Sequence, residues 1–127
     1  MVSCQERILL VEDEEDIAFV LKIRLEAVGY EVHTEASGAV ALSYAAQHQP
    51  NLVILDIKLP DLGGHEVCRE LRKLYGHSEL PVLMFTGLDG PMDDIPGFVA
   101  GADRYLSKRS EPEELFRAVE ELLSQPA

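Results

Sequence analysis

Short apolar segments that alternate with segments of helical periodicity constrain the fold of this 127-residue chain more than any other feature. Apolar runs of about four to eight residues are typical of strands buried on both faces, and apolar residues three or four positions apart indicate a helix packed on one side. Strands and helices that alternate along a chain form a parallel sheet with helices on both faces. The expected strands cover residues 7–11, 31–35, 51–55, 82–85 (ending at Thr86) and 102–106.

The helical segments between these strands have recognisable starts and ends. Ser37 is placed to cap the second helix, which ends before Pro50, and Gly29 suits the C-terminal cap of the first. The expected apolar faces consist of Ile17, Val20, Leu21, Leu25 and Val28 in the first helix, Val40, Ala41, Tyr44 and Ala45 in the second, Val67, Leu71 and Leu74 in the third, and Leu115, Val119, Leu122 and Leu123 in the last.

Two further segments bear on where helices form. Ser110 and Glu113 have the spacing of a capping box, so we expect Ser110 to cap the last helix. Between residues 87 and 97, Pro91 and Pro96 interrupt the helical pattern. Because proline removes a backbone donor and clashes with the preceding turn, we expect a fourth helix that is short or frayed. The pattern as a whole predicts five strands that alternate with five helices.

The length and composition predict one globular domain. We expect a single domain over residues 1–127, with a core of about residues 6–124 and no output domain. Hydrophobic residues make up 46% of the chain and charged residues 27%, which is ordinary for such a domain. Cys4 and Cys68 form no CxxC pair. We expect both to be reduced thiols of a cytoplasmic protein.

The net charge of −12, from 23 acidic and 11 basic side chains, argues against partners that carry negative charge. A chain this acidic repels phosphates, so we expect no direct contact with nucleic acid and none with an anionic membrane surface. The longest apolar run covers residues 17–21, far short of the roughly 20 residues that span a membrane. Residues 1–6 contain no signal-peptide core. Clustered carboxylates can instead hold a divalent cation.

Polar side chains follow four of the expected strands. Glu12 and Asp13 follow the first, Asp56 follows the third, Thr86 ends the fourth, and Lys108 comes just after the fifth. The carboxyl ends of parallel strands lie at one edge of the sheet, where ligands bind in this class of fold. We therefore expect these five residues, distant in sequence, to meet in one crevice.

The chemistry of this set is coherent. Three carboxylates at one edge repel each other, and a hard cation such as Mg²⁺ relieves the repulsion. A carboxylate beside Mg²⁺ can also act as a nucleophile and form an aspartyl-phosphate. Lys108 and the hydroxyl of Thr86 suit the oxygens of a phosphoryl group, whose transfer requires mainly positioning and neutralisation of charge.

Four motifs give the chain a resemblance to the receiver domain of two-component response regulators over nearly its whole length. They are ILLVEDE at the first strand, LVILDIKLPDLGG at the third, VLMFTG at the fourth and GADRYLSK at the fifth. The resemblance implies an α/β fold of the flavodoxin-like kind, a doubly wound five-stranded parallel sheet in the order 2-1-3-4-5. It also implies a phosphorylation-controlled switch rather than an enzyme, because the chain would catalyse only its own phosphorylation and dephosphorylation.

The resemblance assigns the phosphoryl chemistry to single residues. Asp56 would accept the phosphoryl group from a phosphohistidine on a sensor kinase or a histidine phosphotransfer protein. Lys108 and Thr86 would hold the phosphoryl oxygens. Thr86 would move on phosphorylation and Tyr105 would turn inward behind it. The surface of the fourth helix, fifth strand and fifth helix would then change its contact with a downstream output domain or protein.

The resemblance also implies a Mg²⁺ site. Asp13 and Asp56 would bind the metal through their side chains, Glu12 would act through a water molecule, and Lys58 would contribute its backbone carbonyl. Dimerisation through the fourth and fifth elements is left open by the sequence.

The chain departs from the family pattern after Lys108, where Arg109 replaces the usual proline. A cis bond between Lys108 and Arg109 would cost roughly 2.5–4 kcal/mol, so we expect a trans bond, a displaced Lys108 and a weaker phosphoryl contact. The prolines of the fourth helix are the second departure, and we expect switching there to differ from the usual pattern.

Two other functions fit part of the pattern. A receiver-like interaction module that no longer depends on phosphorylation would suit the replaced proline and the interrupted fourth helix. A Mg²⁺-dependent phosphatase of the haloacid-dehalogenase type also uses an aspartate nucleophile. Such enzymes usually carry a second aspartate two residues later, where this chain has Lys58.

Overall fold

The computed structural model describes residues 5–76, 79–87 and 101–124. The expected fourth helix falls on residues outside these ranges, apart from Gly87. No helix in the described ranges combines the length and the apolar character needed to cross a membrane. The strands are β1 (Arg7–Val11), β2 (Glu31–Glu35), β3 (Leu52–Leu55), β4 (Val82–Thr86) and β5 (Arg104–Ser107), and the helices are α1 (Glu15–Ala27), α2 (Gly38–His48), α3 (Gly64–Leu74) and α5 (Pro112–Leu123).

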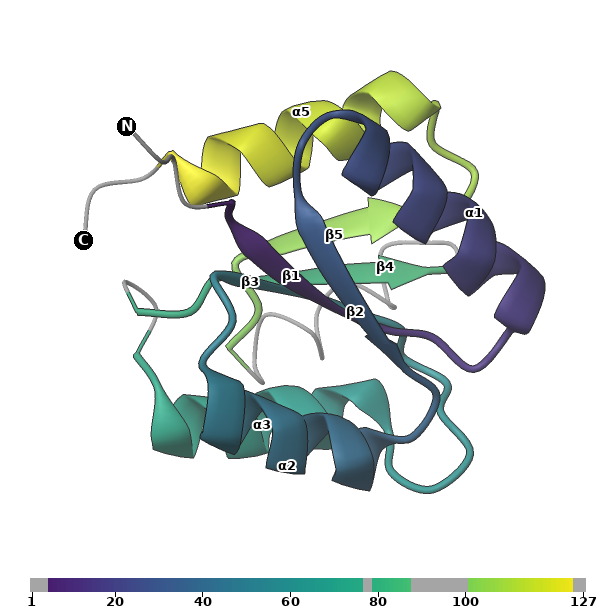
Figure 1. The fold of residues 1–127 in the computed structure, drawn as a ribbon. Helices are drawn as coiled ribbons and strands as arrows, with labels where there is room; N and C mark the ends of the chain where they lie inside the picture. Colours follow the sequence, from purple (N-terminus) through teal and green to yellow (C-terminus); the bar gives the residue numbers. More distant parts are fainter. Residues whose placement is uncertain (1–4, 77–78, 88–100, 125–127) are drawn as a thin grey trace.

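The five strands form one parallel sheet in the order β2-β1-β3-β4-β5, which confirms the predicted fold. The helices α1 and α5 cover one face of the sheet, and α2 and α3 cover the other (Figure 1). Residues 8–11 of β1 and 52–55 of β3 lie in the middle and are at most 1% exposed. Continuous apolar runs suit these two strands because helices bury both of their faces.

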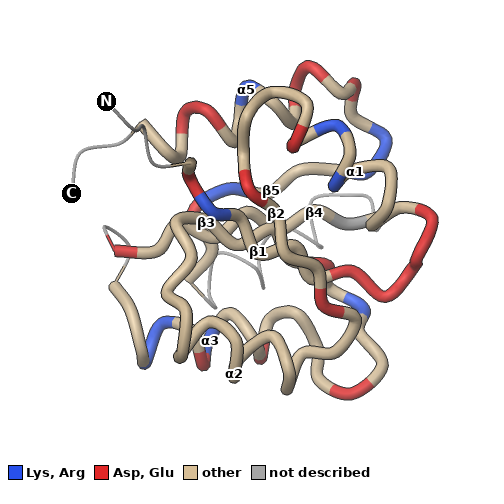
Figure 2. Tube along the Cα trace, viewed as in Figure 1, with Lys and Arg blue, Asp and Glu red and all other residues tan. Residues whose placement is uncertain are grey.

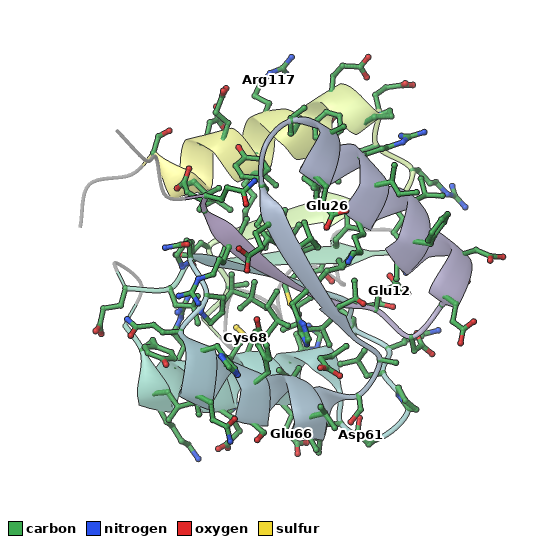
Figure 3. All side chains as sticks on the ribbon, viewed as in Figure 1. Glu12, Glu26, Asp61, Glu66, Cys68 and Arg117 are labelled. Atoms are coloured by element: carbon green, nitrogen blue, oxygen red, sulfur yellow. The ribbon has the colours of Figure 1, made fainter. Side chains whose placement is uncertain are left out.

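Each face of the sheet has its own apolar core, because successive residues of a strand point to opposite sides. Leu9 and Val11 of β1 join the core beneath α2 and α3, whereas Ile8 and Leu10 join the core beneath α1 and α5. Cys68 of α3 is completely buried in the first of these cores (Figure 3). Burial raises the pKa of its thiol to about 11, so Cys68 is a neutral packing residue.

Four residues predicted on apolar helix faces are exposed instead. Val20 and Val28 of the first helical segment are 44% and 56% exposed, Val40 of α2 is 49% exposed, and Leu74 of α3 is 50% exposed. Helical spacing places them within one turn of a buried residue, but the stripe that touches the sheet is narrow. In α1 only Ala18, Leu21 and Leu25 are buried.

The last helix begins one residue later than predicted. Its first residue is Pro112 and its N-cap is Glu111, whose N–H donates to the carboxylate of Glu114 at 3.3 Å. Proline suits the first helical position because its ring fixes φ and lacks an N–H that would have no helical partner there. The predicted capping box of Ser110 and Glu113 was therefore wrong by one residue.

The strands match the predicted ranges closely except at β3 and β5. β3 begins at Leu52, because Asn51 turns its side chain to the N–H of Arg7, which donates to it at 2.7 Å. β5 covers Arg104–Ser107 rather than 102–106. The residue before it, Asp103, uses its side chain to join β5 to β4.

A buried ion pair fixes the amino ends of β4 and β5. The guanidinium of Arg72 in α3 donates to the carboxylate of Asp103 at 2.5 Å. It also donates to the carbonyl oxygens of Gly101 and Leu80 at 2.8 and 2.6 Å. The same carboxylate accepts the N–H of Val82 at 2.8 Å. The side chains of the pair are only 12% and 14% exposed, so one guanidinium joins α3, β4 and β5 away from water.

Arg72→Ala should lower the free energy of unfolding by about 3 kcal/mol, because it leaves Asp103 without its buried partner. Urea denaturation followed by circular dichroism measures the change. Arg69→Ala is the control, since Arg69 is an exposed arginine of the same helix and its loss should cost less than about 0.5 kcal/mol. Equal losses in the two variants would contradict this account of the ion pair.

Candidate functional site

The polar residues that follow the strands meet at the carboxyl edge of the sheet, at the right of Figure 1. Glu12 and Asp13 follow β1, Asp56 follows β3, Thr86 is the last residue of β4, and Lys108 follows β5. Figure 2 shows acidic residues without a break through the turn from β1 into α1 at this edge. The parallel strands thus bring the predicted residues to one place.

Glu12, Asp13 and Asp56 form a compact acidic group. Each contributes one carboxylate oxygen, and these three atoms lie within 4.8 Å of one another. Glu12 and Asp56 are 3% and 5% exposed, whereas Asp13 is exposed. Two buried carboxylates beside one that faces solvent suit a hard cation that keeps part of its water shell. The donor set therefore fits Mg²⁺.

Lys108 contacts the two buried carboxylates of this group. Its Nζ is 2.8 Å from Oε1 of Glu12 and 3.1 Å from Oδ2 of Asp56. The peptide bond to Arg109 is trans, as predicted, since the described residues contain no cis bond. The predicted displacement of Lys108 and its weaker phosphoryl contact stay predictions. Its side chain is only 15% exposed and contacts Asp56 directly.

Burial and neighbouring charges shift the pKa values of Glu12 and Lys108. Burial raises the pKa of Glu12, and the charge of Asp56 adds to this rise, although the hydrogen bond from Lys108 opposes it. Burial also disfavours the cation of Lys108, but its hydrogen bonds and ion pairs with the two carboxylates outweigh this and raise its pKa. Lys108 therefore stays charged, and one ammonium group offsets only part of the repulsion between two carboxylates.

Glu14 is a member of the site that the sequence pattern did not single out. Its N–H donates to the second carboxylate oxygen of Glu12 at 3.1 Å, and its own carboxylate lies 3.7 Å from Nζ of Lys108. Glu14 is the exposed N-cap of α1. The signal available in the sequence was its place two residues after Glu12 in an unbroken run of acidic residues.

The loop from β3 to α3 is closed tightly at its base. The N–H of Gly64 donates to the carbonyl of Ile57 at 2.7 Å. A Cβ atom at Gly64 would lie 2.2 Å from the carbonyl oxygen of Asp56, so only glycine fits there. Lys58, the predicted source of a backbone ligand, is exposed and is the first residue of this closed loop.

Thr86 and Tyr105 lie on neighbouring strands. Thr86 is the last residue of β4 and pairs with Ser107 of β5, while its side chain is outside the described part of the structure. Tyr105 pairs with Met84, and its half-buried ring packs on the core beneath α2 and α3 with the hydroxyl oxygen enclosed. A switch role for these two residues stays a prediction.

A groove of about 350 Å³ runs between α1 and the start of α5 and reaches Lys108. Its walls include the apolar residues Ile17, Val20 and Phe116, with Arg24 at the side. An apolar surface thus adjoins the charged site, on the face of the sheet that α1 and α5 cover.

Gly64→Ala should lower the free energy of unfolding by about 3 kcal/mol, because the added methyl group forces the backbone of Asp56 to move. Gly63→Ala is the matched control. No atom lies within 4 Å of a Cβ at Gly63, so this variant should lose less than about 1 kcal/mol. Thermal unfolding measures the stability of both variants. Equal stability would show that the backbone of Asp56 can move away from an added methyl group at position 64 at little cost.

Comparison with known proteins identifies the architecture. The family model described as response regulator receiver domain matches residues 8–120. The receiver domain of Klebsiella pneumoniae RstA, in its BeF3-activated form, superimposes with a TM-score of 0.89 at 31% identity, covering 94% of this chain and all of that one. A CheY-like receiver domain protein of Methanospirillum hungatei has a TM-score of 0.88 at 33% identity and covers 94% of each chain.

The chain spans about half the length of the curated relatives it matches. It is 43% identical over 119 residues to the probable transcriptional regulator ycf27 of Cyanophora paradoxa, which covers 94% of this chain and 48% of that protein. It is 40% identical over 117 residues to RpaA of Synechocystis, named a DNA-binding dual master transcriptional regulator, with 92% and 48% covered. The expectation of no contact with nucleic acid therefore finds no support in these relatives.

Proposed function

The chain belongs to the response regulator receiver family, and on that premise we propose that it is a phosphorylation-controlled signalling switch with Asp56 as the phosphoacceptor. One observation carries the proposal. The carboxylate of Asp56 is 5% exposed, lies in a group of three carboxylates and is 3.1 Å from the ammonium of Lys108. A nucleophile, a phosphate-binding cation and a set of metal ligands are thus together, as aspartyl phosphorylation requires.

The donor is a phosphohistidine of a sensor kinase or a histidine phosphotransfer protein. A carboxylate oxygen of Asp56 attacks phosphorus, a P–O bond forms as the P–N bond breaks, and the imidazole nitrogen leaves with the electron pair. Lys108 is already beside the attacking group and offsets negative charge on the phosphoryl oxygens, and Thr86 contributes its hydroxyl. The chain catalyses only its own phosphorylation and dephosphorylation.

Mg²⁺ is the cofactor of this reaction. Asp13 and Asp56 would bind it through their side chains, Glu12 would act through a water molecule and Lys58 would supply its backbone carbonyl. The compact acidic group and the raised pKa of Glu12 support the proposal, because burial and carboxylate repulsion are what a divalent cation relieves. When bound, the metal neutralises charge on the phosphoryl group.

The phosphorylated chain acts on a downstream output domain or protein through the surface of β5, α5 and the residues between β4 and β5, and it works in the cytoplasm. The relatives named as transcriptional regulators favour a transcriptional output.

Incubation with Mg²⁺ and acetyl phosphate should add one phosphoryl group to the wild-type chain and none to Asp56→Asn, because the amide is not a nucleophile for phosphorus. Intact-mass spectrometry measures the adduct. Glu26→Gln is the control, because Glu26 is an exposed carboxylate at the far end of α1. Adduct formation on Asp56→Asn would refute Asp56 as the acceptor, and no adduct on a wild type that binds Mg²⁺ would favour the phosphorylation-independent module.

Mg²⁺ should stabilise the folded chain by about 1.4 kcal/mol when its free concentration is about ten times its dissociation constant. Asp13→Asn should abolish this gain, because it removes the one exposed carboxylate of the group. Urea denaturation at several Mg²⁺ concentrations measures both. An equal gain in stability in the variant would show that Asp13 is not a ligand of the metal.

The groove beside Lys108 is the proposed docking surface for the phosphodonor. It adjoins the acceptor, and its apolar wall suits the apolar face of a donor helix. Val20→Asp should slow transfer from a histidine kinase that phosphorylates the wild type by about tenfold, without changing phosphorylation by acetyl phosphate. Val40→Asp is the matched control, because Val40 is 49% exposed on the opposite face of the sheet. Equal slowing in both variants would remove the groove from consideration.

A further inference from the structure

We propose that Asp61 is a positioning residue that fixes the loop between β3 and α3 to the first turn of α2 and so holds the Lys58 carbonyl where a Mg²⁺ ion binds. This inference rests on the proposed function, because it concerns the metal site of that reaction. The carboxylate of Asp61 contacts none of the side chains in the acidic group described above, so its effect on the metal site would be indirect.

The carboxylate of Asp61 accepts three hydrogen bonds from the start of α2. The hydroxyl of Ser37 donates to it at 2.9 Å, and the N–H groups of Gly38 and Ala39 donate at 2.8 and 2.9 Å. Figure 3 shows Asp61 beside this end of α2. The first turn of α2 contains no acidic residue of its own, so Asp61 supplies the negative charge that the helix dipole favours there.

These donors favour the ionised form of the carboxylate although the side chain is exposed. The hydrogen bonds from Ala39, Gly38 and Ser37 hold the pKa of Asp61 well below its usual range. The contact is therefore fully formed at neutral pH. It is lost only as the pH falls through that lowered pKa, below the ordinary titration range of aspartate.

The loop between β3 and α3 makes few other contacts that could fix its position. Its base is closed between Ile57 and Gly64, and Leu59 and Leu62 pack on the core beneath α2 and α3. The Asp61 side chain makes the polar contact between this loop and α2. Lys58 is exposed and lies between the base and this contact, so the position of its carbonyl depends on both.

Gly38 makes the approach of loop and helix possible. A Cβ atom at this position would lie 2.8 Å from Cγ2 of Val67, 3.1 Å from Cβ of Leu62 and 3.4 Å from the carboxylate of Asp61. The start of α2 therefore lies directly against the loop. The contact joins the loop after β3 to the helix after β2, and β1 lies between these two strands in the sheet.

The test compares Mg²⁺ affinity in the full 127-residue chain, titrated with MgCl₂ in the absence of phosphodonor, for wild type, Asp61→Ala and Asp61→Asn. Loss of this outer contact should raise the Mg²⁺ dissociation constant by about tenfold. At saturating Mg²⁺, phosphorylation by acetyl phosphate should return to within about twofold of wild type, since the acceptor is untouched. Amide hydrogen exchange should accelerate at residues 58–62 in both variants.

Two controls separate positioning from simple loss of stability. Glu79→Ala removes a carboxylate that accepts the N–H of Gly76 at 3.0 Å in the loop between α3 and β4, and it should leave Mg²⁺ affinity unchanged. Ser37→Ala weakens the cap of α2 but keeps two of the three donors to Asp61, so it should lower stability and change Mg²⁺ affinity less than Asp61→Ala does.

The outcomes are distinct. Wild-type binding of Mg²⁺ with unchanged affinity in folded Asp61→Asn would overturn this proposal alone and reduce Asp61 to a cap of α2. A wild-type chain that binds no Mg²⁺ would overturn the proposed function and this inference with it. Weakened binding in both Asp61 variants, with the Glu79 control unaffected, would support the positioning role.

Discussion

One ammonium group between two buried carboxylates governs this structure. Glu12 and Asp56 are almost fully enclosed, and each would repel the other in a partly dry environment without Lys108. The sheet order explains why the three meet, since β1 lies next to β3 and β5 ends at the same edge. The arrangement remains incompletely neutralised, because the charge of Asp56 still raises the pKa of Glu12. The carboxyl edge of the sheet thus keeps an excess of negative charge, which a cation can neutralise, beside the ammonium group, which can bind a phosphoryl group.

Most of the fold was predictable because strand and helix patterns alternate so regularly. β1 and β2 have the predicted bounds, and a continuous apolar run such as residues 52–55 is typical of a strand buried on both faces. The site was predictable for a related reason. Parallel strands all end at one edge, so a residue placed directly after a strand, such as Asp56 or Lys108, has its position fixed by the topology before any side chain is considered.

The features that escaped prediction depend on contacts between segments distant in sequence. The pattern of α1 could not show that Val20 faces solvent, because the width of the buried stripe is set by the packing of the helix on the sheet. The need for glycine at position 64 arises from the backbone of Asp56, and the role of Asp61 from the start of a helix some 22 residues earlier. The cap of α5 differs for a local reason, since Pro112 outweighs the spacing of Ser110 and Glu113.

The ion pair of Arg72 and Asp103 has a mechanical consequence. It fixes β4 and β5 to α3 at their amino ends, whereas Thr86 and Lys108 lie at the opposite ends of these strands. The two strands are therefore joined at their amino ends by one charged side chain of α3, and along the rest of their length by backbone pairing as far as Thr86 and Ser107. The end of the sheet that carries the site residues depends on this pairing rather than on an ion pair with α3.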